Sequence, residues 1–281
     1  MGQHTQQVDV GDATLHVRTD GAADAPVLLL VHGLGASTAW WNPVVPCLAD
    51  AYRVVRVDLA GHGRSQGLDT PGAYGIPGHA ERVGTVLDRL GVQRVAVAVG
   101  HSTGGYVVCD LARQRPETVS ALALISTGPS PEADTSGGAL SRLLFARVPG
   151  ALLWRAFTEA IVRKSLSTAF ARPAAPLPDA LVEDTRRMTH RALAGTARGS
   201  LAHIRERTLP DRLAELGKPL LVFFGAQDAR WHASSAEDYR AVPGARVVVL
   251  PDIGHTPMYE DPQMTCDLLL EFAGAAVRLG G

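Results

Sequence analysis

Short apolar runs, each about the length of one β-strand, recur along the chain. They occupy residues 27–31, 53–57, 94–99, 119–125, 219–224 and 246–250. Because these runs are apolar at successive positions, both of their faces are expected to be buried. This pattern is typical of interior strands in a parallel sheet that is covered by helices on each side.

Segments with helical periodicity fall between several of these runs. Residues 79–90 place an apolar side chain every three or four positions and stop at Gly91, which suits a helix C-terminus. Near the end of the chain, Asp261 and Pro262 are typical of an N-cap and a first helical residue. The alternation of strands and helices predicts a doubly wound α/β fold with a mostly parallel sheet flanked by helices.

The alternation stops between residues 128 and 213. That stretch has no strand-like run and contains helix-like segments at 140–146, 151–163 and 181–193. An interruption of this length is too long for an unstructured loop in a compact domain. The sequence therefore predicts a core made of residues 1–128 and 211–281, with residues 129–210 inserted as a helical cap.

Composition narrows the classes of partner. The net charge is −1 over 281 residues, and the charged residues of both signs are mixed, so we expect no nucleic-acid or membrane partner. The N-terminus lacks a signal-peptide pattern, and the apolar runs are too short to span a bilayer. The expectation is a cytoplasmic monomer or homodimer that acts on a small molecule.

The three cysteines are odd in number and far apart. Cys47, Cys109 and Cys266 each lie in or beside an apolar stretch, which predicts buried free thiols in a reducing compartment. Neither the cysteines nor the histidines show metal-ligand spacing. We expect no metal and no cofactor.

Ser102 is the strongest candidate for chemistry. It is the centre of Gly100-His101-Ser102-Thr103-Gly104, which follows an apolar run and precedes a helix-like segment. A sharp strand-to-helix turn needs small neighbours and lifts the serine oxygen clear of the sheet. The backbone N–H of Thr103 then lies at the start of a helix, where a developing negative charge is favoured.

A second pentapeptide, at residues 63–67, has the same Gly-x-Ser-x-Gly pattern around Ser65. It also follows a strand-like run, but residues 68–72 are turn material and not an apolar helical repeat. We interpret Ser65 as a loop residue.

A nucleophilic serine needs a base and a group that orients the base. His255 and Asp228 each lie just past the carboxyl end of a predicted strand, the edge of a parallel sheet where ligands bind. Their order in the chain is Ser, Asp, His. Asp228 could instead be a helix N-cap, with Asp252 or Glu260 supplying the carboxylate, and His255 could be an ordinary loop residue. His101 is expected to pack beside the site or line its pocket.

These residues and their surroundings resemble the α/β-hydrolase superfamily, in its branch of lid-bearing esterases, C–C hydrolases and haloperoxidase-like enzymes. The resemblance covers most of the chain outside residues 129–210. It is carried by five segments in the family's order, at residues 32–35, 58–65, 100–104, 225–228 and 254–262.

The resemblance implies a site as well as a fold. Ser102 is the expected nucleophile, His255 the base and Asp228 its orienting carboxylate, while the N–H groups of Leu34 and Thr103 form the oxyanion hole. His32 is expected to shape its loop. Pocket candidates are six apolar side chains near these segments or in the inserted lobe: Trp40, Trp41, Trp154, Phe157, Trp231 and Met258.

The leading hypothesis is a serine hydrolase acting on a carboxylic ester or lactone of a hydrophobic small molecule. Thioesterase and perhydrolase activities stay open, and C–C hydrolysis is less favoured because Thr256 follows His255 where such relatives commonly have Trp. Two other classes remain. One is a catalytically idle ligand-binding protein of this fold, and the other is a dinucleotide-binding oxidoreductase, which residues 33–38 and Asp58 superficially resemble.

Overall fold

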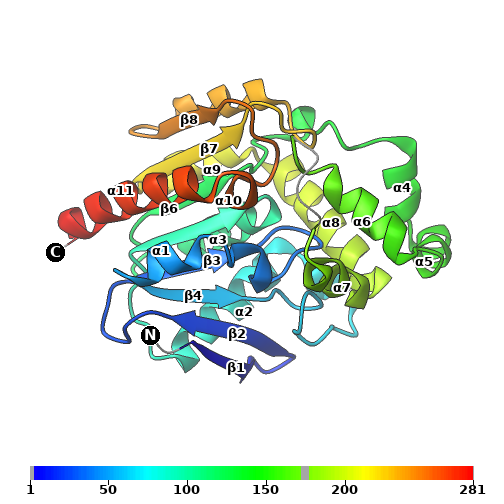
Figure 1. Ribbon diagram of the computed structural model, residues 1–281, viewed down its shortest axis with the longest axis horizontal. Coiled ribbons are helices and arrows are strands. Elements are labelled where there is room, and N and C mark those ends of the chain that lie inside the picture. The colour runs from blue at the N-terminus through cyan, green and yellow to red at the C-terminus, as the bar shows by residue number, and fades with distance from the viewer. Residues whose placement is uncertain (1–2, 172–176, 281) are drawn as a thin grey trace.

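The computed structural model describes residues 3–171 and 177–280. Its centre is an eight-stranded sheet (Figure 1). The strands are β1 (His4–Asp9), β2 (Thr14–Asp20), β3 (Val27–Val31), β4 (Arg53–Val57), β5 (Val97–His101), β6 (Leu122–Ile125), β7 (Leu220–Gly225) and β8 (Arg246–Leu250). Their order across the sheet is β1-β2-β4-β3-β5-β6-β7-β8. Strands β3 to β8 are parallel, and β1 and β2 are antiparallel additions at one edge.

All six predicted strands form, so the expected α/β fold with a mostly parallel sheet is confirmed. The predicted and observed bounds differ mainly at β5 and β6, where Val95 and Val119 pair only as an isolated bridge. Strands β1 and β2 were not predicted. Most side chains of β1 are polar and solvent-exposed, so this edge strand lacks the apolar pattern on which the other strands were recognised.

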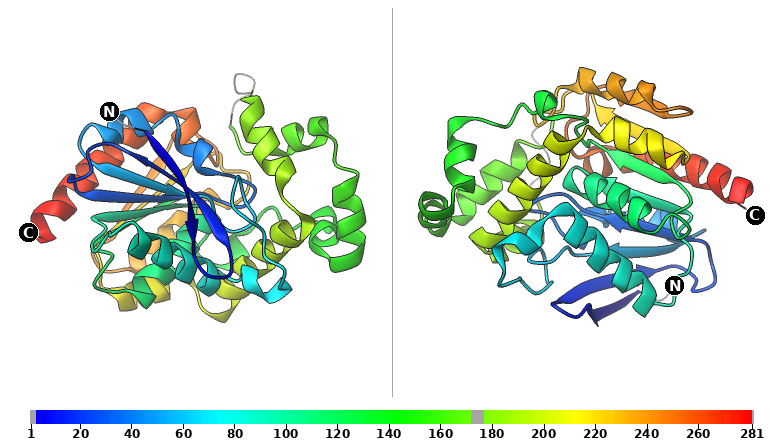
Figure 2. Two further views of the ribbon diagram at one scale, coloured as in Figure 1. Left: turned by 90° about the horizontal axis from the view of Figure 1, so that it is seen from below. Right: turned by 180° about the vertical axis from the view of Figure 1, so that it is seen from behind.

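Helices cover both faces of the sheet (Figure 2). They are α1 (Val45–Ala49), α2 (Ile76–Arg89), α3 (Thr103–Gln114), α4 (Ala139–Phe145), α5 (Arg147–Arg155), α6 (Glu159–Ser167), α7 (Asp179–Arg187), α8 (His190–Glu206), α9 (Leu209–Leu216), α10 (Pro257–Glu260) and α11 (Pro262–Gly280). Short 3₁₀ helices span Thr38–Trp41, Pro71–Tyr74, Pro131–Ala133 and Ala233–Ala241.

Side chains alternate between the two faces of each strand and so feed two hydrophobic cores. On β3, Leu28 and Leu30 join the core beneath α1 and α11, whereas Leu29 and Val31 join the core beneath α2 and α3. Because both faces of these strands are buried, their sequences are continuous apolar runs. At the start of α11, the Asp261 carboxylate accepts a hydrogen bond from the backbone N–H of Met264, so the predicted N-cap is present.

Helices α4 to α8 gather beyond the carboxyl ends of the parallel strands (Figure 1), and we call them the helical lobe. Two of its predicted helices, 151–163 and 181–193, are each two helices. Thr158 and Thr189 separate them, because each hydroxyl accepts a backbone N–H and starts a new helix, α6 or α8. The division of the chain into a core and a cap at residues 129 and 210 stays a prediction.

The prediction of three free thiols is wrong. Cys47 on α1 and Cys266 on α11 form a disulfide across 219 residues of sequence, and only Cys109 among the three is free and buried. Spacing along the chain carries no information about two helices that meet only in the folded state. The argument for a reducing compartment that rested on free thiols therefore does not hold.

The described residues contain no helix that combines the length and the apolar character needed to cross a lipid bilayer.

Candidate active site

Ser102 occupies the turn between β5 and α3 in a strained conformation. Its φ is 51° and its ψ is −120°, a region that residues with a side chain rarely adopt. The flanking glycines are required by close packing. A Cβ on Gly104 would overlap the carbonyl group of Val31, and one on Gly100 would overlap the backbone of Gly104. The Ser102 side chain makes no capping hydrogen bond to α3.

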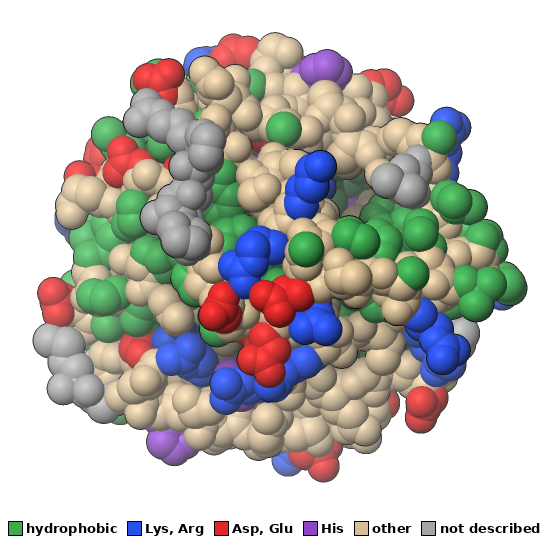
Figure 3. Space-filling model, turned by 45° about the vertical axis from the view of Figure 1, so that its right-hand side comes forward, with side chains coloured by type: hydrophobic (Ala, Val, Ile, Leu, Met, Phe, Trp, Pro, Cys, Tyr) green, Lys and Arg blue, Asp and Glu red, His purple; other side chains and the backbone are tan. Residues whose placement is uncertain are grey.

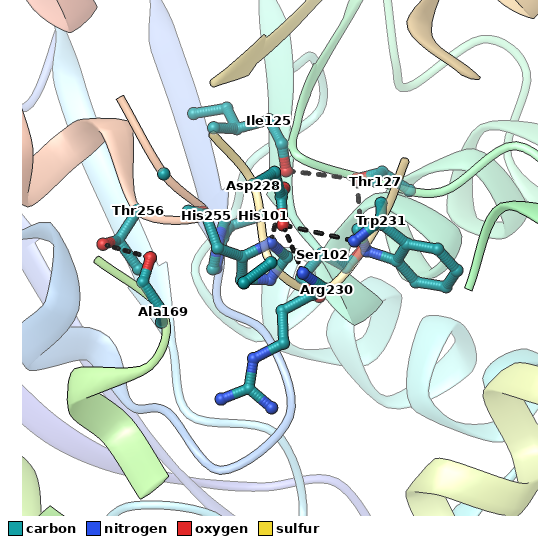
Figure 4. A network of polar contacts seen from close by, with 12 residues as sticks. His101, Ser102, Ile125, Thr127, Ala169, Asp228, Arg230, Trp231, His255 and Thr256 are labelled. Atoms are coloured by element: carbon teal, nitrogen blue, oxygen red, sulfur yellow. Dashed lines mark hydrogen bonds and ion pairs between the residues drawn. The ribbon is translucent and has the colours of Figure 1, made fainter. Parts of the chain in front are cut away.

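His255 and Asp228 form a hydrogen-bonded pair beside this turn (Figure 4). Nδ1 of His255 lies 2.8 Å from Oδ2 of Asp228, whose side chain is fully buried. Burial raises the pKa of the Asp228 carboxyl, but the charge and hydrogen bond of His255 and the N–H groups of Arg230 and Trp231 outweigh this effect and lower it. The carboxylate is therefore ionised at neutral pH and can only accept, so in the neutral imidazole Nδ1 is the protonated nitrogen and Nε2 has the lone pair.

Asp228 performs two tasks at once. While Oδ2 meets His255, Oδ1 accepts hydrogen bonds from the N–H groups of Arg230 at 2.7 Å and Trp231 at 3.2 Å. Asp228 is not a helix N-cap, because the next helix, the 3₁₀ helix Ala233–Ala241, has His232 at its N-cap. Oδ1 of Asp228 closes a turn instead. Both carboxylate oxygens are held, which fixes the orientation of the ring.

His101 links the serine turn to the histidine loop. Its ring lies 4.8 Å from the ring of His255, centroid to centroid, and its Nε2–H donates to the carbonyl oxygen of His255 at 2.8 Å. Burial, and then the charge of His255, lower the pKa of His101 to about 3. This imidazole is neutral at neutral pH, and its contacts are those of a packing residue that holds the His255 loop against the turn.

The loop after β3 closes the other side of the turn. A Cβ on Gly33 would lie 3.0 Å from the Cβ of Ser102, so the backbone of residues 33 and 34 passes directly beside the serine. Gly35 has a φ of 75°, which lets the chain turn away into the 3₁₀ helix. Leu34 is partly buried, and Thr103 begins α3. Backbone N–H groups on this loop and at this helix start are suited to a developing oxyanion.

Helix α7 of the helical lobe holds this loop. Thr185 donates its hydroxyl proton to the carbonyl oxygen of Gly35 at 2.6 Å, and Ser37 donates to the carboxylate of Asp184 at 2.6 Å. The Thr185 side chain also contacts the carbonyl of Leu181 in its own helix. Sequence reasoning missed these residues, since nothing in a helical stretch shows which loop it contacts.

Glu260 holds the histidine loop. Its carboxylate accepts the backbone N–H groups of Gly254 at 3.0 Å and of Ala171, from the helical lobe, at 2.7 Å. The N–H of His255 donates in turn to the carbonyl of Ala169 at 2.7 Å. Glu260, an alternative carboxylate for His255 in the sequence, thus binds backbone groups and joins the loop to the lobe.

The predicted pocket residues fall in different places. Trp41 and Met258 are fully buried in the core beneath α1 and α11, so the structure does not bring them to an accessible pocket. Trp154 lies in the helical lobe, where its Nε1–H donates to the carbonyl oxygen of Met188. Its ring centroid is 5.2 Å from that of Phe157. Trp231 is partly buried and packs against Gly128, close to Asp228.

Trp40 lies in a third apolar cluster, between the core and the lobe. It packs with residues such as Val162 and Leu181 of the lobe, and its ring is 5.5 Å from that of Tyr259. This tryptophan therefore helps to attach the lobe.

Ser65 is a loop residue, as its surroundings in the sequence predicted. Its hydroxyl donates to the backbone carbonyl of Asp58 at 2.6 Å and accepts the N–H of His16.

The buried carboxylate of Asp58 does not suit a dinucleotide-binding site. It is hydrogen-bonded to the His16 ring and to the N–H groups of Thr38 and Arg64. A dinucleotide ribose could not reach it, and only a four-residue 3₁₀ helix follows the glycine loop. The oxidoreductase hypothesis is thereby disfavoured.

His32 shapes its loop, as expected. It is fully buried, its Nε2 accepts the N–H of Leu59 at 3.0 Å, and its Nδ1–H donates to the carbonyl of Gly33. Among the residues that the structure describes, no group of three or more His, Cys, Asp or Glu side chains is placed to hold a metal ion.

Comparison with known proteins defines the class. A family model described as the alpha/beta hydrolase fold matches residues 26–262. An uncharacterized protein of Mycobacterium tuberculosis is 30% identical over 94% of this chain and 82% of its own length. A pimeloyl-acyl-carrier-protein methyl ester esterase of Edwardsiella ictaluri is 29% identical over 88% of this chain and 92% of its own length.

A solved structure gives the same result. The crystal structure of a hydrolase from Pseudomonas aeruginosa PA01 is 30% identical, covers 96% of this chain and 98% of its own, and superposes with a TM-score of 0.80. The chain belongs to the α/β-hydrolase family. It is a hydrolase, with esterases among its relatives.

Proposed function

We propose that the protein is a serine hydrolase that cleaves a carboxylic ester or lactone of a hydrophobic small molecule, with Ser102, His255 and Asp228 as its catalytic residues. The observation that carries the proposal is the hydrogen-bonded pair of His255 and Asp228 beside a strained serine turn. Support for an ester comes from the similarity to the Edwardsiella ictaluri methyl ester esterase.

The reaction follows from the roles of these atoms. Nε2 of His255 accepts the proton of the Ser102 hydroxyl as Oγ attacks the carbonyl carbon. The N–H groups of Leu34 and Thr103 stabilise the oxyanion of the tetrahedral intermediate. When the C–O bond to the leaving alcohol breaks, the imidazolium returns its proton to that alcohol, and an acyl-enzyme remains on Ser102.

Water completes the cycle by the same path. His255 accepts a proton from water as the hydroxide attacks the acyl carbon, and it then protonates Ser102 Oγ when the carboxylic acid leaves. Ionised Asp228 stabilises the imidazolium in both steps. No redox partner or metal is needed for this balance.

The test compares Ser102→Ala with Ser65→Ala, since both serines sit in a Gly-x-Ser-x-Gly pentapeptide. We expect Ser102→Ala to lower kcat on short p-nitrophenyl esters by about 10⁴-fold or more, with the protein still folded. Ser65→Ala should retain most of the parent kcat, because its hydroxyl only ties a loop.

A fluorophosphonate probe separates the hydrolase from an idle binding protein. The parent protein should be labelled on the peptide that contains Ser102 and not on the peptide that contains Ser65, as read by mass spectrometry. A Ser102→Ala protein as active as the parent would falsify the proposal.

A further inference from the structure

The helical lobe carries a concentration of exposed apolar side chains. Leu143 on α4 and Val148 and Leu152 on α5 have exposed fractions of 47%, 71% and 65%. We call these three residues the α4–α5 face. Figure 3 shows hydrophobic side chains gathered on the right-hand side of this view, where the lobe lies. Large apolar side chains that cluster in water mark an interaction surface.

The packing of α5 forces this face outward. Val148 and Leu152 are four residues apart and so lie on one side of the helix. The opposite side is occupied: Gly150 is buried so tightly against the carbonyl of Leu144 that a Cβ would overlap it. Trp154 is held there by its hydrogen bond to Met188. The helix cannot turn its apolar side inward without losing these contacts.

Exposed arginines lie on the same two helices. Arg142, Arg147 and Arg155 are all exposed, and no Asp or Glu occurs between Asp134 and Glu159. In the two described stretches of chain, none of the three arginines forms an ion pair with a carboxylate. At 100° per residue, Arg155 lies on the same side of α5 as Val148 and Leu152.

A fourth arginine extends this positive surface. Arg198 on α8, also exposed, donates to the carbonyl oxygen of Phe145 at the end of α4. The net charge of −1 for the whole chain therefore conceals a local excess of positive charge beside exposed apolar groups.

This combination selects the kind of partner. A second copy of the chain placed on the same face would bring like-charged arginines together, which opposes self-association. A partner with an apolar interior and a negatively charged surface layer would contact both kinds of side chain, the apolar residues in its interior and the arginines at its surface. We propose that the α4–α5 face docks on an anionic lipid surface, with Leu143, Val148 and Leu152 inserted among the lipids and the arginines at the headgroups.

This docking is independent of the chemistry assigned to Ser102. It replaces, for this surface, the expectation of no membrane partner that the bulk charge suggested. Because the lobe also contacts the loops around Ser102, docking would bring the candidate site to the lipid surface.

The test measures vesicle binding by the full-length chain. Ser102→Ala protein is mixed with vesicles of phosphatidylcholine alone or with about a quarter phosphatidylglycerol, and bound protein is separated by flotation. We expect binding to the anionic vesicles to be about tenfold stronger or more, and to weaken as salt is raised. The Ser102→Ala background keeps lipid hydrolysis out of the measurement.

Two variants and one control locate the contact. Val148→Ser with Leu152→Ser, and separately Arg142, Arg147 and Arg155 all changed to Gln, should each reduce binding to anionic vesicles by about tenfold or more. Met264→Ser with Val277→Ser removes two exposed apolar side chains from α11 instead and should bind like the parent. Thermal unfolding checks that each variant is folded.

Several results would overturn the proposal. They are equal binding to both kinds of vesicle, parent-like binding by both α4–α5 variants, or a concentration-dependent dimer that the Val148→Ser, Leu152→Ser variant abolishes while vesicle binding persists. The α4–α5 variants made with Ser102 intact should still hydrolyse a water-soluble ester at the parent rate. Loss of esterase activity by the parent itself would count against the proposed function and not against docking.

Discussion

Two carboxylates lie close to His255, and they hold different parts of it. Asp228 binds the imidazole at Nδ1, whereas Glu260 binds backbone N–H groups on either side of residue 255. The sequence left both open as partners of the histidine, because Asp228 lies at the same edge of the predicted sheet and Glu260 follows the histidine closely along the chain. Only the hydrogen bonds of the folded loop separate an orienting role from a scaffolding role.

The two roles predict different losses. Asp228→Asn keeps the shape of the side chain but removes the charge that stabilises the imidazolium, so we expect kcat to fall by about 10³–10⁴-fold. Glu260→Gln should lower the free energy of unfolding by about 1–2 kcal/mol through weaker hydrogen bonds to the backbone. Its kcat/KM should stay within about tenfold of the parent. Ester hydrolysis and urea unfolding of the two variants measure both effects.

Asp252 completes this comparison as the third carboxylate considered from the sequence. It is exposed on the same loop with a φ of 57°. Asp252→Asn should hydrolyse esters like the parent. A larger loss of kcat in Glu260→Gln or Asp252→Asn than in Asp228→Asn would reverse the assignment.

At the scale of elements, the interior strands and the strand-to-helix turn were predictable, because buried runs and glycine-flanked turns are local features. The contacts that tie the lobe to the site were not. Thr185 lies in a helical pattern that says nothing of Gly35, which is 150 residues away along the chain. The disulfide of Cys47 and Cys266 depends likewise on two helices packing on one face of the sheet.

The contact of α7 with the loop after β3 predicts a catalytic effect at a distance from the reacting atoms. Thr185→Val keeps the volume but leaves the Gly35 carbonyl without its donor, which frees the loop that carries the Leu34 N–H. We expect kcat to fall about tenfold with KM little changed, since the oxyanion forms only in the transition state. Steady-state kinetics on a p-nitrophenyl ester measure both constants.

Rescue distinguishes this positioning role from a general loss of stability. Thr185→Ser retains the hydroxyl and should recover most of the parent kcat. The matched change Thr196→Val removes another buried threonine hydroxyl, on α8, which contacts His79 and not the loop after β3. If Thr196→Val lowered kcat as much as Thr185→Val, the effect would not belong to the loop.

The whole molecule buries several histidines in their neutral form. Burial, as the largest cause, lowers the pKa of His62 and of His101 to about 3. The pKa values of His32 and His79 are also lowered by burial. These side chains come from a strand, a helix and loops. Three of them pack on one another, with His62 5.3 Å from His32 and 6.2 Å from His79 between ring centroids.

This burial predicts how stability depends on pH. A histidine whose pKa lies near 3 when folded and near 6.5 when unfolded binds more protons in the unfolded state between these values. The stability that comes from keeping such a histidine neutral is fully present above pH 6.5 and is lost as the pH falls toward 3. The free energy of unfolding should therefore decrease below pH 6.5 by about 1.4 kcal/mol per pH unit for each such histidine. Urea unfolding at pH 7, 6 and 5 measures the slope.

Between pH 7 and 5 the buried histidines, and not the buried carboxyls, should determine the slope. The pKa values of the Asp58 and Asp228 carboxyls are lowered, so the stability that these two groups contribute is lost only below the ordinary carboxyl pKa of 3.8. His101→Gln removes one buried imidazole but keeps a donor for the carbonyl of His255, so its slope should be shallower by about 1.4 kcal/mol per pH unit. The control His4→Gln changes an exposed residue of β1 and should keep the parent slope. A stability that stays constant from pH 7 to 5 in the parent would mean that the buried rings can be protonated within the fold, against the low dielectric that surrounds them.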